Sequence, residues 1–126
     1  MVSKKIAVFK VNLKSAIKQF LYITKPMHKL TSQEINVLTL ILFSYYREQV
    51  NFKRDDDVWK FVFDYDNKMN IKKELQMGNA VFQNTLTALR KKNVLKDNKV
   101  VPVFRPNIKQ GDKVFELTFR FELNGQ

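Results

Sequence analysis

Apolar side chains recur at intervals of three or four residues in four stretches of the chain, which is the spacing of amphipathic helices. The predicted helices span residues 13–23, 32–47, 66–76 and 79–92. Asn12 is a suitable N-cap for the first helix, and Pro26 closes that segment. Thr31 and Glu34 have the spacing of a capping box before the second helix. Because the apolar face of this second helix is wide, we expect it to be the central buried helix.

A short break separates the last two predicted helices. Gly78 lies in this break, and we predict that it supplies the positive φ that a sharp turn after a helix needs. Asn79 is then the predicted N-cap of the following helix. The residues expected to face the core are Met69, Ile71 and Leu75 before the break, and Phe82, Leu86 and Leu89 after it.

Alternation of apolar and polar positions predicts the strands, because successive side chains of a strand point to opposite faces. Residues 58–65 alternate in this way, with four aromatic side chains on one face, although the run is also long enough for a helix. A short strand is predicted over Lys5–Val11. The stretches 99–104 and 113–122 are joined by the turn-rich segment 105–112, which predicts a hairpin.

The composition narrows the class of protein. The chain has 126 residues and 44% hydrophobic side chains, which suits one compact domain with a real core. It has no cysteine, which excludes disulfides and thiolate catalysis. No apolar run reaches the ~18 residues of a membrane span. The net charge of +11 is typical of a protein that binds nucleic acid.

The charge is unevenly distributed along the chain. Residues 1–30 contain seven lysines and no acidic residue, and residues 67–99 contain eight basic residues against two acidic ones. Residues 31–66 have the opposite balance, with four basic and seven acidic side chains. A general excess of lysine does not explain this deficit in the middle, so two segments are expected to produce the positive field.

Residues 71–95 carry a pattern that resembles the winged helix-turn-helix family. A first helix ends in Leu75, a turn containing Gly78 follows, and the second helix has apolar anchors at intervals of four and three before it closes on basic residues. The helix that opens near Leu30 is similar to that of replication-initiator-like and phage-type regulator members. The resemblance covers residues 30–123. It implies an α+β fold over 30–126, with the elements in the order helix, strand, helix, turn, helix and hairpin. The basic segment 1–29 is then an N-terminal extension with a strand and a helix.

The resemblance implies a viral or prokaryotic duplex-DNA-binding protein, either a transcriptional regulator or a replication-initiation accessory. Helix 79–92 is expected to read the major groove, and the wing at 105–112 to contact the backbone or the minor groove. On a helical projection, the face opposite the apolar anchors carries amides, a hydroxyl and basic groups. The candidate DNA-binding residues are Lys72, Lys73, Asn79, Ala80, Gln83, Asn84, Thr87, Arg90, Lys91, Arg105, Lys109 and Lys113.

Other functions have weaker support in the sequence. The aspartates at 55–57 lack the spacing of a calcium loop, and His28 is the only histidine, so neither a metal site nor catalysis is expected. No nucleotide-binding motif is present, and we expect no cofactor and no enzymatic activity. The main alternative is a winged-helix module that docks on another protein in a polymerase, virion or other assembly. A homodimer through residues 1–29 and a cytoplasmic location are further expectations.

Overall fold

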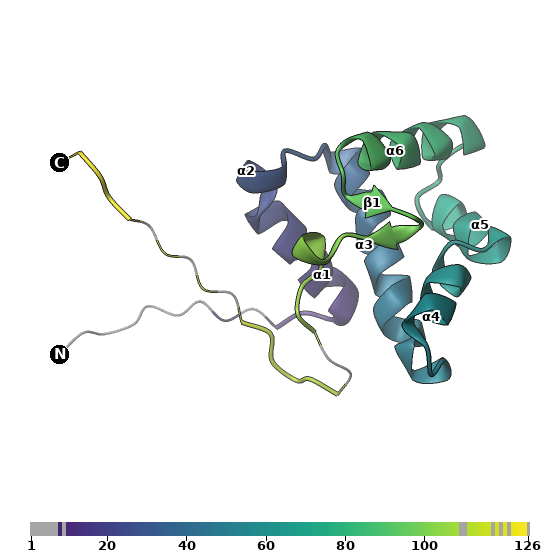
Figure 1. Ribbon diagram of the computed structural model, residues 1–126, viewed down its shortest axis with the longest axis horizontal. Coiled ribbons are helices and arrows are strands. Elements are labelled where there is room, and N and C mark those ends of the chain that lie inside the picture. The colour runs from purple at the N-terminus through teal and green to yellow at the C-terminus, as the bar shows by residue number, and fades with distance from the viewer. Residues whose placement is uncertain are drawn as a thin grey trace.

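The computed structural model describes residues 8, 10–108, 111–116, 118, 120 and 122–125. These residues form a mostly helical α+β fold with a small two-stranded antiparallel sheet (Figure 1). The elements are α1 (Leu13–Ile23), α2 (Lys25–His28), α3 (Ser32–Glu48), η1 (Gln49–Asn51), α4 (Asp55–Val62), α5 (Tyr65–Glu74), α6 (Asn79–Lys91), β1 (Leu95–Lys96), β2 (Lys99–Val100) and η2 (Pro102–Phe104). Helix α3 runs through the middle and packs against α1, α4, α5 and α6.

Helix α3 is the central helix that the sequence predicts. Its capping box is present: the Thr31 hydroxyl accepts from the Glu34 N–H at 3.1 Å, and Glu34 Oε1 accepts from the Thr31 N–H at 2.8 Å. Its buried residues lie on nearly every side of the helix, among them Ile35, Leu38 and Leu42. Helices therefore cover α3 from several directions, and it forms the centre of the hydrophobic core.

Helix α1 also agrees with its predicted bounds. The side chain of Asn12 accepts from the Ser15 N–H at 2.8 Å, which caps the helix. Ile17, Phe20 and Leu21 are buried in the same core as α3. Thus α1 belongs to the same packed unit as the helices that follow it, and its apolar face is used within the chain.

The predicted strand over Lys5–Val11 lies, apart from Val8, Lys10 and Val11, outside the described residues. Pro26 does not simply close the first segment, because it occupies the first turn of α2, where a missing N–H costs nothing. After α2, His28 Nδ1 accepts from the Leu30 N–H at 3.0 Å, which leaves Nε2 to donate to the Leu21 carbonyl at 2.8 Å. The single histidine thus connects α1 to the start of α3.

The prediction of a strand over 58–65 is wrong, because residues 58–62 belong to α4, Tyr65 begins α5, and Phe63 and Asp64 cap these two helices. Three aspartates fill the first turn of α4, where carboxylates interact favourably with the helix dipole. One turn later, Trp59 Nε1 donates to Asp55 Oδ2 at 3.1 Å. Val58 and Val62 are buried together with Trp59, so side chains that a strand would place on opposite faces share one side of a helix.

The hairpin lies earlier in the chain than predicted. Leu95 pairs with Val100 across β1 and β2, and the turn between the strands consists of Asp97 and Asn98. These two residues have φ of 53° and 56°. Two-residue hairpins favour turns in which both central residues have positive φ, and Asp and Asn tolerate that conformation.

The predicted hairpin of 99–104 and 113–122, with a wing at 105–112, is therefore wrong. Pro102 has no N–H to donate to a ladder and instead begins the short helix η2. The described residues of 113–122 belong to no strand. They form part of the segment that extends away from the helical body in Figure 1.

The turn between α5 and α6 is tight, but its glycine does not have the predicted conformation. Gly78 has φ −70° and ψ 161°, and it is the N-cap of α6, while Asn79 is the first helical residue. The positive φ, 52°, belongs to Gln76. The Met77 N–H bonds the Lys72 carbonyl and the Gln76 N–H bonds the Lys73 carbonyl, which is the pattern of a Schellman motif.

We expect Gln76→Gly to raise the free energy of unfolding by about 0.5–1 kcal/mol, because glycine adopts the left-handed conformation without a steric penalty. Gly78→Ser should stabilise by a similar amount, since its extended backbone suits a capping hydroxyl. A Cβ at position 78 meets no atom within 4 Å. Urea unfolding of the two variants tests this assignment. If Gln76→Gly destabilises the protein and Gly78→Ser unfolds it, the left-handed residue is Gly78 instead.

Candidate nucleic-acid interface

Helix α6 has one buried side and one side that faces solvent. Phe82, Thr85, Leu86 and Leu89 are buried against the rest of the fold, which confirms the predicted apolar anchors. The opposite side, called here the outer face of α6, is exposed. It consists of Asn79, Ala80, Gln83, Asn84, Thr87, Arg90 and Lys91. The structure thus brings together on one helix every candidate residue that the sequence assigned to it.

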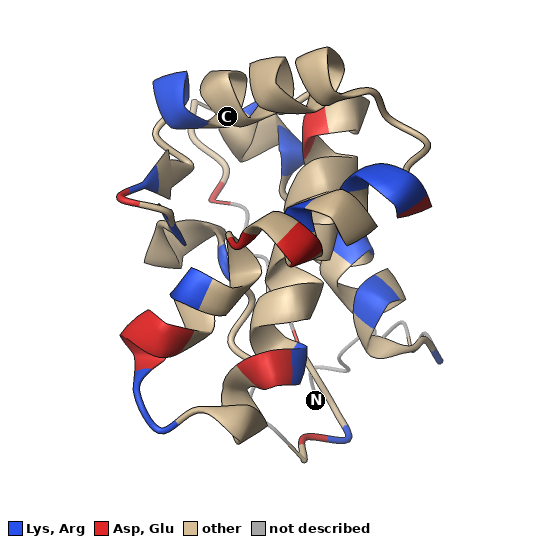
Figure 2. Cartoon of the chain, turned by 90° about the vertical axis from the view of Figure 1, so that its right-hand side faces the viewer, with Lys and Arg blue, Asp and Glu red and all other residues tan. Residues whose placement is uncertain are grey.

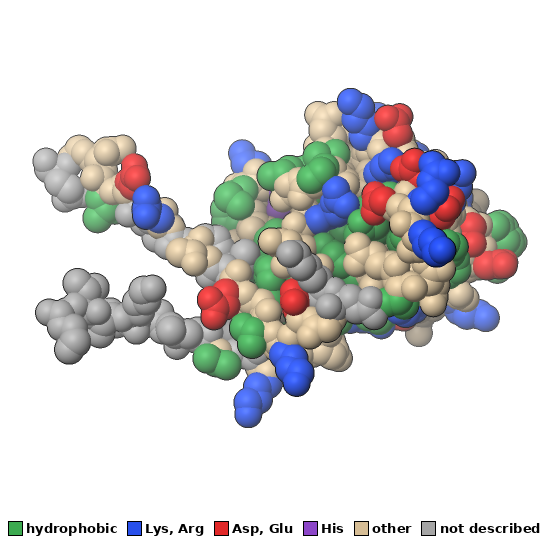
Figure 3. Space-filling view, turned by 60° about the horizontal axis from the view of Figure 1, so that its bottom comes forward, with side chains coloured by type: hydrophobic (Ala, Val, Ile, Leu, Met, Phe, Trp, Pro, Cys, Tyr) green, Lys and Arg blue, Asp and Glu red, His purple; other side chains and the backbone are tan. Residues whose placement is uncertain are grey.

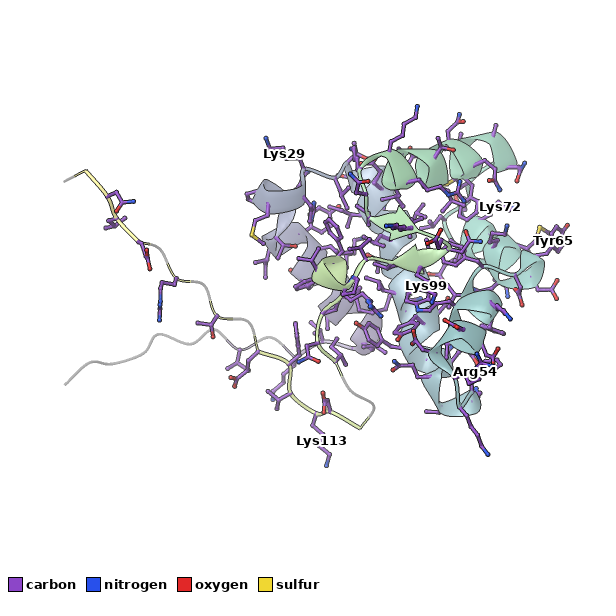
Figure 4. All side chains as sticks on the ribbon, in the orientation of Figure 1. Lys29, Arg54, Tyr65, Lys72, Lys99 and Lys113 are labelled. Carbon is purple, nitrogen blue, oxygen red and sulfur yellow. The ribbon has the colours of Figure 1, made fainter. Side chains whose placement is uncertain are left out.

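The junction of α5 and α6 holds one lysine in place. Lys72 Nζ donates to Asn79 Oδ1 at 3.0 Å and lies 5.8 Å from the centre of the Phe82 ring. This half-buried lysine therefore ties the end of α5 to the start of α6; its side chain is labelled in Figure 4. Lys73 is exposed on the next position. An open hollow at this junction is lined by Met69, Lys72, Lys73, Gln76, Met77, Gly78 and Asn79.

Met69 was expected to face the core, but its side chain is 43% exposed and borders this hollow. It lies one helical turn after Tyr65, which is 70% exposed. The buried residues of α5 are instead Ile71 and Asn67. Asn67 Nδ2 donates to the Val62 carbonyl at 2.7 Å, so a buried amide joins the end of α4 to α5. A polar residue thus takes a core position that apolar periodicity does not predict.

Arg105 does not lie on a wing. Its guanidinium lies 5.6 Å from the ring centres of both Tyr45 and Trp59 and donates to the Tyr45 hydroxyl at 3.4 Å. The two rings stack on each other with centres 4.1 Å apart. Tyr45 in turn donates a hydrogen bond to Asp55. The arginine therefore covers an aromatic cluster between α3 and α4, and its predicted place on a wing is wrong.

The other two candidates of the predicted wing do not join the outer face of α6. Lys109 lies outside the described residues. Lys113 is exposed on the C-terminal segment, on the side of the molecule away from α6 (Figure 4). The hairpin that does follow α6 carries Lys96, which is exposed on β1. The two-residue turn at Asp97 and Asn98 is the sequence signal that would have placed Lys96 beside the helix.

An ion pair holds the hairpin against α4. Lys99 Nζ donates to Asp56 Oδ1 at 2.5 Å. This hydrogen bond and the charge of Lys99 lower the pKa of Asp56, and the same contact raises the pKa of Lys99. The ammonium group of Lys99 is thus paired with the carboxylate of Asp56 within the chain.

A second ion pair holds the end of α6 against the start of α3. Lys92 Nζ lies 2.6 Å from Glu34 Oε1. Burial acts to raise the pKa of Glu34, but the hydrogen bonds from Lys92 and Thr31 and the charge of Lys92 outweigh it, so the pKa is lowered. Lys92 therefore has a structural partner, whereas Arg90 and Lys91 lie on the outer face.

The outer face of α6 contains no acidic side chain, although Glu34 pairs with Lys92 beneath the end of the helix. In Figure 2, α6 lies along the top, tan over most of its length and blue at its end, and the blue end of α5 lies below its beginning. The acidic first turn of α4 lies at the far end of the molecule. Figure 3, which brings that far end forward, shows positive and negative side chains interleaved. The outer face of α6 thus offers basic and neutral polar groups without a carboxylate.

The described residues contain neither a metal-binding cluster nor a membrane-spanning helix. No group of three or more His, Asp or Glu side chains lies close enough together there to hold a metal ion. Within the same residues, no helix has the length and apolar character needed to cross a membrane.

Comparison with protein-family models, curated proteins and solved structures finds no match to this chain.

Proposed function

We propose that this chain is a duplex-DNA-binding protein of the winged helix-turn-helix type, which acts in transcriptional regulation or in replication initiation. Helix α6 enters the major groove, and α5 contacts the backbone beside it. The short β1–β2 hairpin takes the position of the wing, in place of residues 105–112.

The outer face of α6 is the observation that carries the proposal. It is exposed, and its side chains are two kinds of group that DNA binds: neutral amides and a hydroxyl for base edges, and cations for phosphates. No acidic residue occurs between Asn79 and Lys96 to repel the phosphate backbone. A helix with this surface has the diameter that the major groove admits.

The connection between α5 and α6 supports the same proposal. A Schellman motif ends α5, and the Lys72–Asn79 hydrogen bond joins it to α6, so the angle between the two helices is fixed by several contacts. A fixed angle lets the first helix rest on the backbone while the second lies in the groove. Lys73 at the end of α5 and Lys96 on β1 are both exposed, and in this proposal they contact phosphates beside α6.

The salt dependence of binding tests the proposal. For a duplex-binding protein, the logarithm of affinity falls linearly with the logarithm of salt concentration, with a slope of about −0.9 per phosphate contact. We expect the double variant Arg90→Ala, Lys91→Ala to make this slope shallower by about one to two units. Fluorescence anisotropy with a labelled duplex at several salt concentrations measures it.

The matched control is the double variant Lys53→Ala, Lys113→Ala, which removes the same charge from exposed lysines away from α6. It should leave the slope of the parent unchanged. Equal slopes in all three proteins would show that the outer face of α6 is not on the DNA. Binding that resists salt and requires a protein partner would favour the docking module instead.

A further inference from the structure

The first ten residues of α6, Asn79 to Ala88, contain no charged side chain. On the outer face, this stretch presents Ala80, Gln83, Asn84 and Thr87, all exposed. The cations Arg90 and Lys91 follow only in the last turn. The part of the helix that would lie deepest in the groove is therefore built from methyl groups and primary amides.

Each base pair shows a different pattern of groups in the major groove, and side chains match it by geometry. Primary amides of Asn and Gln bind adenine at N6 and N7 together, and small apolar groups contact the C5-methyl of thymine. Guanine is read by Arg or Lys, and the amino group of cytosine by Asp or Glu. The neutral stretch of α6 contains the first two kinds of side chain and neither of the last two.

Internal hydrogen bonds sharpen this assignment. The Thr87 hydroxyl donates to the Gln83 carbonyl at 3.0 Å, so its hydrogen is already used and the side chain offers a methyl group and an acceptor oxygen. Asn79 Oδ1 accepts from Lys72, which makes Asn79 a positioning residue at the helix start. Among the residues that the structure describes, no hydrogen bond involves the side-chain amides of Gln83 and Asn84, because the contact of Gln83 with Thr87 uses its backbone carbonyl. These two amides remain available to a ligand.

We propose that the outer face of α6 selects A·T base pairs in the major groove, with Gln83 and Asn84 on adenine and Ala80 and Thr87 on the thymine methyl. This inference rests on the proposed function and adds the class of DNA that the helix prefers. Any guanine in the site lies at the end of the helix, where Arg90 and Lys91 reach.

The experiment starts with a selection of the full chain on a duplex library with a randomised centre. We expect the enriched sites to contain a run of A·T pairs. Two analogues of the selected duplex then test the groups involved: deoxyuridine in place of thymidine removes the C5-methyl, and 7-deazaadenine removes N7. Because a good base contact contributes about 1–3 kcal/mol, a fully engaged adenine should lose about 5- to 150-fold in affinity, and loss of methyl contacts about 3- to 10-fold.

Two variants assign the contacts to residues. In Asn84→Ala, affinity should be lower and the penalty for 7-deazaadenine should shrink, while the penalty for deoxyuridine persists. In Ala80→Gly the reverse pattern is expected, and circular dichroism confirms that both variants keep their helix. Lys113→Ala serves as the control that keeps both penalties.

The outcomes separate the two proposals. If the chain binds no duplex, the proposed function fails. If it binds but enriches G·C sites, or if neither analogue changes the affinity for an A·T site, the DNA-binding function stands and the inference about α6 is overturned. A protein that recognises A·T pairs from the minor groove would also give this last result, because neither analogue changes the groups exposed in the minor groove.

Discussion

Replacing Phe82 by alanine should lower the free energy of unfolding by about 3–5 kcal/mol, the range found when a buried phenylalanine is truncated. Phe82 is fully buried in the first turn of α6, where it faces the core. The truncation removes apolar contacts and leaves a cavity beneath the helix that carries the candidate interface. Urea unfolding followed by circular dichroism gives the change directly.

The neighbouring substitution Val81→Ala is the control. Val81 is 44% exposed, so we expect its loss to change stability by less than about 1 kcal/mol. If Phe82→Ala is equally mild, α6 is not anchored through Phe82. If the prediction holds, specific DNA binding should also weaken in Phe82→Ala at temperatures where the variant is still folded, because the position of α6 is then less fixed.

The second large effect is expected at the ion pair between Lys92 and Glu34. Lys92→Met should destabilise the protein at neutral pH, because the buried Glu34 carboxylate loses its charged partner. Since the Lys92 side chain is 39% exposed and screened by water, we expect about 1–2 kcal/mol rather than the larger cost of a fully buried pair. Thr31 still donates to the carboxylate.

The pH dependence of this effect has a definite sign. The pKa of Glu34 is lowered in the folded parent from its usual value of 4.5, so the carboxylate contributes stability above about pH 4.5. That contribution is lost as the pH falls through the folded pKa, and the difference between Lys92→Met and the parent should shrink with it. Lys91→Met, an exposed neighbour, is the control. A difference that stays constant down to acidic pH would contradict the electrostatic explanation.

The helices whose ends are set by local contacts could be predicted from the sequence. Asn12 caps α1, and the Thr31–Glu34 capping box starts α3, as expected from their spacing. The strand predicted over 58–65 failed because the alternating aromatics fit a strand, while Val58, Trp59 and Val62 in the same run have the spacing of one helix face. What decides for a helix is the contact of Trp59 with Asp55 and the stacking of Trp59 on Tyr45, and the second contact is set by the tertiary fold.

The part of the candidate interface that lies on a single helix could be predicted from the sequence. The residues whose positions depend on contacts with side chains distant in the sequence could not. The outer face of α6 follows from helical geometry and the positions of Phe82 and Leu86. Arg105 was misplaced because its partners, Tyr45 and Trp59, lie far away in the sequence. The left-handed residue was assigned to Gly78 by its type, whereas the hydrogen bonds of the turn place that conformation at Gln76.

Because the β1–β2 hairpin is short, it limits the number of base pairs that one molecule can contact. Each strand has two residues, about 7 Å at the usual rise, and Lys99 holds the hairpin to α4. Under the proposed function, base contacts are then made by the 13 residues of α6. This helix is about 20 Å long, which corresponds to roughly six base pairs. A given sequence of six base pairs occurs by chance about once in 4,000 base pairs. One molecule bound to such a sequence therefore cannot distinguish a single site in a genome. The natural binding site should therefore contain several copies of the recognition sequence, in tandem or inverted. Occupancy of the DNA by the protein should rise steeply with the number of copies.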